Sequence, residues 1–154
     1  MVELRDYFLE IDGIPGECQD KIHTNQIRLS DFAFAMKNRS RAGYVVGKTV
    51  FEDVSFSGPI DVSYPKIQDA LAKNMLIKKA TLYCRKAGKS QLDFLTITFK
   101  DLFVSHCRLE SDGSLLNMFI TMSFAKTQID YCPQTDLGTL GGALSAMFDI
   151  MRVK

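Results

Sequence analysis

The chain has 154 residues, of which 46% are hydrophobic and 24% are charged, and its formal net charge is +1. This composition excludes intrinsic disorder, and a membrane protein is not indicated, because no apolar run approaches the roughly 20 residues of a spanning helix. A net charge so close to zero gives no general attraction to nucleic acid. We therefore expect a single domain over residues 1–154.

Two strands are predicted before residue 37. The first covers residues 4–11 and ends in the Gly- and Pro-containing turn 12–16; the second covers residues 26–36. In the second strand the apolar residues switch from odd to even positions. Ile27 and Leu29 would point to one face of a regular strand, and Phe32, Phe34 and Met36 to the other. A bulge near residues 30–31 would put both sets on one face, as happens where a sheet curves into a barrel. The alternative is a strand with two apolar faces, one of them against a partner.

Residues 37–48, KNRSRAGYVVGK, carry four cations and no acid, and we interpret them as a long loop or hairpin. The side chains that matter here are Lys37, Arg39, Arg41, Tyr44 and Lys48. Because only one aromatic residue accompanies the cations, an acidic patch on a protein partner suits this segment better than DNA. A solvated loop without a partner is the simpler alternative.

One helix is predicted, over residues 63–74, after a strand over residues 49–57. Ser63 can cap its first turn, and Pro65 fits inside that turn because its missing N–H would be unsatisfied there. Its apolar positions are Ile67, Ala70, Leu71 and Met75. We expect this short helix to cover an open end or an outer face of the β structure.

A long antiparallel hairpin is predicted over residues 79–107, because a period of two runs through both arms around the polar link 85–90. The remaining predictions are a turn at 111–114, the longest strand at 115–131, a loop at 134–145 and a last strand at 146–153. About eight strands with one helix and no βαβ rhythm predict a mainly β fold. We expect an antiparallel β-barrel of two packed sheets with one short flanking α-helix.

No common catalytic or metal-binding motif occurs, and the chain has only two histidines, His23 and His106. His106 and Cys107 are adjacent in a predicted strand, so their side chains should point to opposite faces rather than form a nucleophile and its base. The acids near the first turn lack the pattern of a calcium loop and are interpreted as solvated: Asp12, Glu17 and Asp20. Without a Cys-x-x-Cys pair, we expect reduced thiols, with Cys84 buried. We predict no catalytic, cofactor-binding or metal-binding residues and no cofactor.

Seven stretches stand out by their order and spacing: YFLEIDGIPGE (7–17), VSF (54–56), YCRKAG (83–88), DFLTITFK (93–100), FAK (124–126), IDY (129–131) and FDI (148–150). Together they resemble the Hcp family, the tube proteins of bacterial type VI secretion systems. The similarity runs nearly from end to end. It implies a β-barrel subunit with a flanking helix and no enzymatic activity.

The resemblance also implies an assembly. Six copies would form a homo-hexameric ring, and the rings would stack into an inner tube that carries effector proteins. Partners would be effectors and the sheath and spike proteins, without nucleic acid and without membrane insertion. Because charged residues interrupt the N-terminal segment where a signal peptide needs an apolar run, we expect a bacterial cytoplasmic protein. It would be exported by type VI secretion to the extracellular space or a target cell.

By the same resemblance, residues 37–48 correspond to an extended loop that reaches toward the next ring, with Glu17 and Asp136 as candidate acidic partners. Ala33 and Ala35, which alternate with larger aromatic residues, are predicted to face the lumen, where bulk would obstruct cargo. Two alternatives stay open. One is a monomeric small-ligand-binding β-barrel of the lipocalin type, and the other is a phage-type tail tube subunit.

Overall fold

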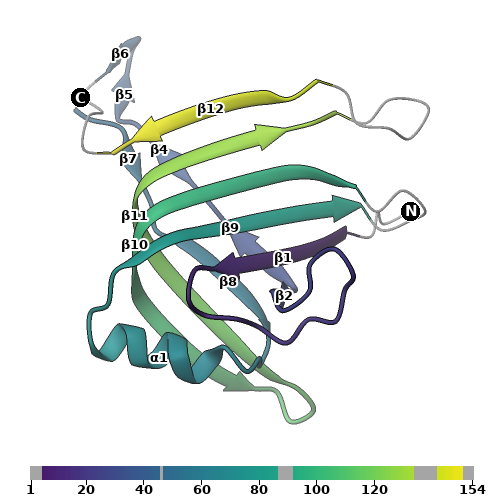
Figure 1. Cartoon of the computed structure of the whole chain (residues 1–154). Coiled ribbons are helices and arrows are strands. Elements are labelled where there is room, and N and C mark those ends of the chain that lie inside the picture. Colours follow the sequence, from purple (N-terminus) through teal and green to yellow (C-terminus); the bar gives the residue numbers. More distant parts are fainter. Residues whose placement is uncertain (1–4, 46, 87–91, 134–141, 151–154) are drawn as a thin grey trace.

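The computed structural model describes residues 5–45, 47–86, 92–133 and 142–150. Within these ranges an eight-stranded antiparallel sheet, in the order β2-β1-β9-β10-β11-β8-β3 with β12 also paired to β11, curls around one core (Figure 1). Its strands are β1 (Arg5–Ile11), β2 (Ile27–Leu29), β3 (Asp31–Ala33), β8 (Val54–Pro59), β9 (Ile77–Lys86), β10 (Asp93–Ser111), β11 (Leu116–Tyr131) and β12 (Leu144–Asp149). The mainly β, antiparallel barrel-like fold predicted from the sequence is confirmed.

The two ends of the sheet meet at Ser30, which joins β2 to β3. β2 pairs with β1 whereas β3 pairs with β8, and the Ser30 amide donates to the Ser57 carbonyl (2.8 Å). Gly58 allows the close crossing, because a β-carbon there would lie 3.0 Å from the Arg28 carbonyl oxygen. The predicted parity change near residues 30–31 is therefore real. The prediction of one bulged strand over residues 26–36 was wrong, because the chain changes pairing partner at this point.

Three neighbouring strands bend at one level of the barrel. In each strand two residues that are not buried separate a pair of buried ones: Ile77 and Ala80, Phe99 and Leu102, and Phe124 and Thr127. The register places Phe99 opposite both Ala80 and Thr127, so the three pairs coincide. Asp101, between them on β10, has a positive φ of 56°. The shared bend turns one sheet into two packed layers.

The barrel interior is filled by side chains. Phe99 is fully buried at its centre, with ring centroids 4.9 Å from Phe124, 5.4 Å from Phe34 and 6.4 Å from Phe56. Other core side chains with no exposed surface are Leu9, Ile27, Val54, Ile67, Leu82, Leu102, Met118, Ile120 and Met122. Phe94 joins this core rather than the outer face, because the register shifts between Asp93 and Leu95.

The helix α1 (Tyr64–Ala72) lies at the lower end of the sheet in Figure 1 and buries Tyr64, Ile67 and Ala70 against the core. Its start differs from the prediction, because the Ser63 hydroxyl makes no capping hydrogen bond and is buried without a partner. The Asp61 carboxylate instead accepts from the Ser63 amide (2.8 Å). Pro65 lies in the first turn as predicted.

Residues 36–51 leave the barrel as a separate hairpin, which confirms the hairpin interpretation of residues 37–48. At its base β4 (Met36–Lys37) pairs with β7 (Val50–Phe51), and beyond it β5 (Ser40–Arg41) pairs with β6 (Tyr44–Val45). The strand predicted over residues 49–57 is thus divided between β7 and β8. Figure 1 shows this hairpin projecting from the upper end of the barrel.

The C-terminal strand begins earlier than predicted, since Leu144 and Ser145 pair with β11 and are not loop. Predictions for residues 87–90, 134–141 and 151–153 fall outside the described residues. No disulfide links the four cysteines, and Cys84 is buried as predicted. In the part of the chain that the structure describes, no helix is both long enough and apolar enough to cross a membrane.

Candidate assembly surfaces

The basic hairpin, residues 36–45 and 47–51, has a base that packs on the barrel and an exposed tip. Its turn is formed by Ala42 and Gly43, whose φ angles of 49° and 87° are both positive, as a two-residue hairpin turn requires. All five predicted stacking residues are exposed: Lys37, Arg39, Arg41, Tyr44 and Lys48. Tyr44 keeps 74% of its surface accessible. The tip therefore presents cations and one aromatic ring to the outside.

The base of this hairpin is tied to the barrel. The Phe51 ring packs against Phe148 and Phe124, at centroid distances of 5.6 and 6.4 Å. Lys37 forms an ion pair with Glu52 (3.5 Å). Among the described residues, Arg39, Arg41 and Lys48 make no ion pair, so their charge is not compensated within the chain.

A second surface lies on the outer face of β3, β8 and β11, where small side chains lie beside Phe119 and Arg108. Ala33 is exposed and opposite Ser55, whose hydroxyl lies 3.4 Å from that of Thr121. A hollow of about 340 Å³ opens here, bordered also by Asp31, Ser57, His106 and Arg108. Ala35 is also exposed, just beyond the end of β3, while Phe32 and Phe34 pack toward the core. The predicted alternation of these four residues is confirmed.

Exposed apolar side chains gather at two further places. The tip of the β10–β11 hairpin carries Leu109, Leu115 and Leu116, which are 44%, 62% and 41% exposed. β12 carries Leu144 and Met147, which are about 70% exposed. β12 pairs with β11 alone among the described strands, so one of its edges is open. Such edges and apolar groups favour contact with another chain.

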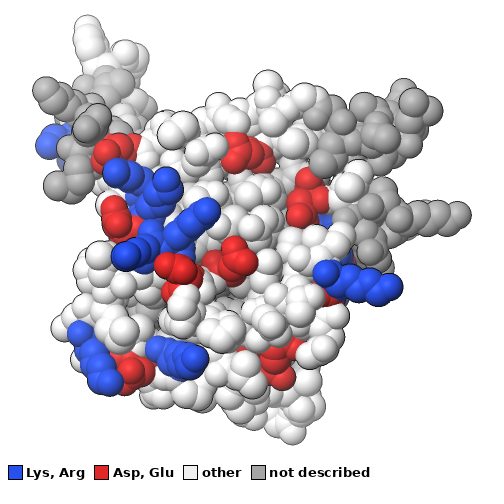
Figure 2. All heavy atoms as spheres, viewed as in Figure 1, with Lys and Arg blue, Asp and Glu red and all other residues white. Residues whose placement is uncertain are grey.

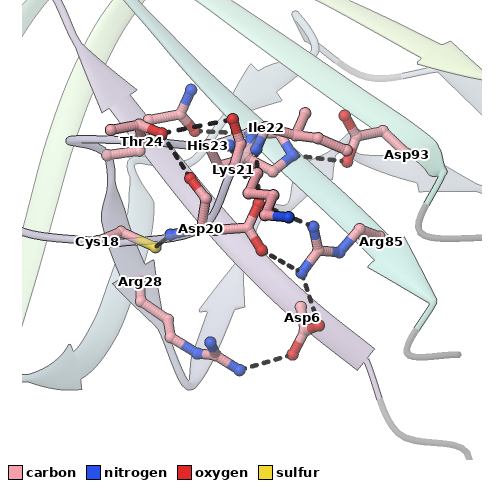
Figure 3. Close-up of polar contacts among 11 residues, drawn as sticks. Asp6, Cys18, Asp20, Lys21, Ile22, His23, Thr24, Arg28, Arg85 and Asp93 are labelled. Carbon is pink, nitrogen blue, oxygen red and sulfur yellow. Dashed lines mark hydrogen bonds and ion pairs between the residues drawn. The ribbon is translucent and has the colours of Figure 1, made fainter.

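A buried ionic network fastens the loop before β2 to the sheet, as Figure 3 shows. Arg85 on β9 is 4% exposed, and its guanidinium donates to both oxygens of Asp20 (3.1 and 2.8 Å) and to Asp6 (3.2 Å). The same group lies 4.8 Å from the centroid of the Phe8 ring. These hydrogen bonds hold the pKa of Asp20 well below its ordinary value. Asp20 was predicted to be solvated, and this was wrong.

His23 completes the same attachment. It is 2% exposed and stacks on Phe8 at a centroid distance of 4.3 Å. One ring nitrogen lies 3.0 Å from Gln26 Oε1 and the other 3.0 Å from Asp93 Oδ1. His23 is thus a core histidine with both nitrogens occupied. Within the described ranges, no cluster of three or more His, Cys, Asp or Glu side chains could hold a metal ion.

His106 and Cys107, which are adjacent in the sequence, lie on opposite sides of the sheet. Cys107 faces α1, where it interacts with Tyr64. The pKa of the Tyr64 phenol is raised, mainly because the phenol is buried and to a smaller extent because of its hydrogen bond with the Cys107 thiol. His106 borders the hollow on the opposite side of the sheet. They do not form a pair, as expected from their adjacency. Glu17 is engaged rather than simply solvated, because its carboxylate accepts from the Val62 amide (2.9 Å).

Comparisons of both the sequence and the structure with known proteins give the same family. The family model described as "Type VI secretion system effector, Hcp" matches residues 8–131. The chain belongs to the Hcp family. The match begins within β1 and ends at Tyr131, the last residue of β11, so β12 lies beyond it.

Individual Hcp proteins agree with this assignment. Protein hcp1 of Pseudomonas aeruginosa is 32% identical over 144 residues, which is 89% of either chain. The crystal structure of Hcp1 from Salmonella typhimurium is 28% identical and superimposes with a TM-score of 0.84 over 97% of each chain. That of a type VI secretion system effector from Yersinia pestis is 27% identical, with a TM-score of 0.78 over 94% of this chain and 99% of the other. As an Hcp family member, the protein acts in type VI secretion, and its partners are components of that system.

Proposed function

We propose that this Hcp protein is a structural subunit without catalytic activity, that six copies form a ring, and that the rings stack into the inner tube of the secretion apparatus. The tube carries effector proteins and contacts sheath and spike proteins. The protein is made in the bacterial cytoplasm and is exported from it by type VI secretion. The observation that carries the proposal is the basic hairpin, whose base packs on the barrel and whose Arg39, Arg41 and Lys48 have no ion-pair partner among the described residues.

Symmetry and charge both favour the basic hairpin as the contact between rings. When two different surfaces of identical copies bind each other, the contact repeats from copy to copy until the copies close into a ring or, if they do not, form an open stack. Stacked rings are an open arrangement of this kind. Arg39, Arg41 and Lys48 lack ion-pair partners among the described residues, so an acidic surface on the next copy would compensate them. Glu17 is exposed and stays a candidate for that surface; Asp136 lies outside the described residues.

The small-ligand barrel is the weaker alternative. Its function needs an internal cavity, whereas the interior here is occupied by Phe99, Met118, Ile120 and their neighbours. The hollows found among the described residues open on the outer surface. A phage-type tail tube subunit shares the ring logic, but the family match favours type VI secretion.

The ring itself is tested by native mass. Light scattering after size exclusion, over a range of protein concentrations, should give a discrete species near six times 17.3 kDa. A monomer at every concentration would contradict the proposal.

Stacking is tested by reversing charge at the hairpin tip. The double variant Arg39→Glu, Arg41→Glu should keep the ring mass but lose species larger than one ring, because like charges would meet across the ring contact. Sedimentation velocity at rising concentration measures both. Lys66→Glu on α1 with Lys73→Glu directly after it makes the same change in net charge at exposed positions and should stack as the wild type does. Equal loss in both variants would count against a specific role for the hairpin.

The lumen assignment is tested with Ala33→Arg. If this small-residue face lines the channel, the added bulk and charge should lower the amount of effector that copurifies with rings by about tenfold, roughly 1.4 kcal/mol of binding. Ring mass should not change. Ala72→Arg, at an exposed position of α1, is the matched control and should retain effector. Loss of the ring in Ala33→Arg would instead place this face between subunits.

A further inference from the structure

A row of three lysines crosses the outer face of the sheet at its bend. The strand register places Lys100 on β10 directly opposite Lys79 on β9 and directly opposite Lys126 on β11. All three side chains are exposed. Figure 2 shows blue side chains gathered over this part of β9, β10 and β11. We call Lys79, Lys100 and Lys126 the lysine row.

The row is unfavourable within the isolated chain. Like charges directly opposite each other on neighbouring strands destabilise a sheet. None of the three lysines forms an ion pair with another described residue. Acidic residues lie at both ends of the row, and Asp101 follows Lys100 along β10. Asp149 is the register partner of Lys126, and the Asp12 amide donates to the Lys79 carbonyl (2.9 Å).

The surface beside the row can receive a side chain. A hollow of about 340 Å³ is bordered by Lys100 and Lys126 together with Thr98, Gln128 and Met147, and Asp149 lines its end. Thr98 offers a hydroxyl as a hydrogen-bond donor, and Met147, 73% exposed, offers an apolar contact. The Gln128 amide already donates to Asp130 (3.1 Å). Lys79 borders a second hollow, of about 670 Å³, on the other side. The row is therefore a cationic ridge between two recesses.

We propose that the lysine row is a docking surface for an acidic helical segment of a protein partner. Adjacent strands are about 4.8 Å apart, and residues three or four apart on a helix are separated by about 5–6 Å. Three carboxylates on one helix face therefore match three lysines across the strands. The acids at each end of the row limit the ligand to this length, and a continuous phosphate backbone would meet both Asp12 and Asp149.

The proposal is independent of ring stacking and is tested with a defined probe. The probe is a 15-residue helical peptide with glutamates at three positions spaced four apart, and its counterpart carries glutamine at the same positions. Calorimetric titration of the full chain at low salt should detect the glutamate peptide and not the glutamine peptide. The triple variant Lys79→Gln, Lys100→Gln, Lys126→Gln should bind about tenfold more weakly, the sum of three exposed ion pairs.

The control removes the same charge elsewhere. Lys21→Gln, Lys66→Gln and Lys73→Gln are exposed lysines outside the row, and their triple variant should bind within about twofold of the wild type. The row variant should melt no lower than the wild type, because its loss removes repulsion. Equal weakening in both variants, equal binding of the glutamine peptide, no binding to the wild type, or tighter binding of a 15-nucleotide single strand of DNA would each overturn the proposal.

Discussion

The Arg85→Met variant should lose about 3–5 kcal/mol of unfolding free energy, the range expected when one partner of a buried ion pair is removed. Arg85 is 4% exposed and binds two carboxylates. Without the guanidinium, the half-buried carboxylates of Asp6 and Asp20 would lose the cation that they share. Urea unfolding followed by far-UV circular dichroism measures the loss, since the chain has no tryptophan for fluorescence.

A matched control and a pH series sharpen this prediction. Lys78→Met makes the same substitution at an exposed position of β9 and should change the unfolding free energy by less than about 0.5 kcal/mol. The Arg85 hydrogen bonds lower the pKa of Asp20 in the folded state. Its stabilising contribution is thus complete above the unfolded value of about 3.9 and declines as pH falls further. The gap between wild type and Arg85→Met should narrow from pH 5 toward pH 2; a constant gap would show that Asp20 is not the partner that matters.

Phe99→Ala should destabilise the chain by a similar amount, about 3–5 kcal/mol, because it empties the centre of the barrel. The ring contacts Phe34, Phe56 and Phe124, and these come from different strands or connections and cannot all move inward. Thermal and urea unfolding measure the loss.

Phe103→Ala is the natural comparison, since it makes the same change on the same strand. Phe103 is 43% exposed, so its loss should cost about 1 kcal/mol or less. If the two variants were equally destabilised, the cavity explanation for Phe99 would fail.

Local pattern predicted most of the fold. Period-two alternation predicted β1 and the strands β9, β10 and β11, and the parity change between Leu29 and Phe32 located the place where the barrel closes. The shared bend of β9, β10 and β11 was not predictable. It needs the register between strands, and the alternation of one strand does not contain that register.

The candidate surfaces divide in the same way. The basic hairpin was predictable because its cations, Tyr44 and Gly43 are consecutive in the chain. The pairing of Arg85 with Asp20 was not, because 65 residues separate them and an acid near a turn is usually solvated. The lysine row was missed for a related reason: Lys79, Lys100 and Lys126 become neighbours only through two strand pairings.

The junction between β2 and β3 at Ser30 also has a consequence for the order in which the chain folds. The β9–β10 and β10–β11 hairpins join consecutive segments and need only short loops to close. β2 pairs with β1 and β3 pairs with β8, and these strands lie near opposite ends of the sheet. The barrel can therefore close at Ser30 only after both ends of the sheet have formed. Non-local pairing of this kind is slow, in the range of milliseconds to seconds. Until then a newly synthesised chain has an open sheet with an uncovered apolar face, and this is the interval in which it is most prone to aggregation.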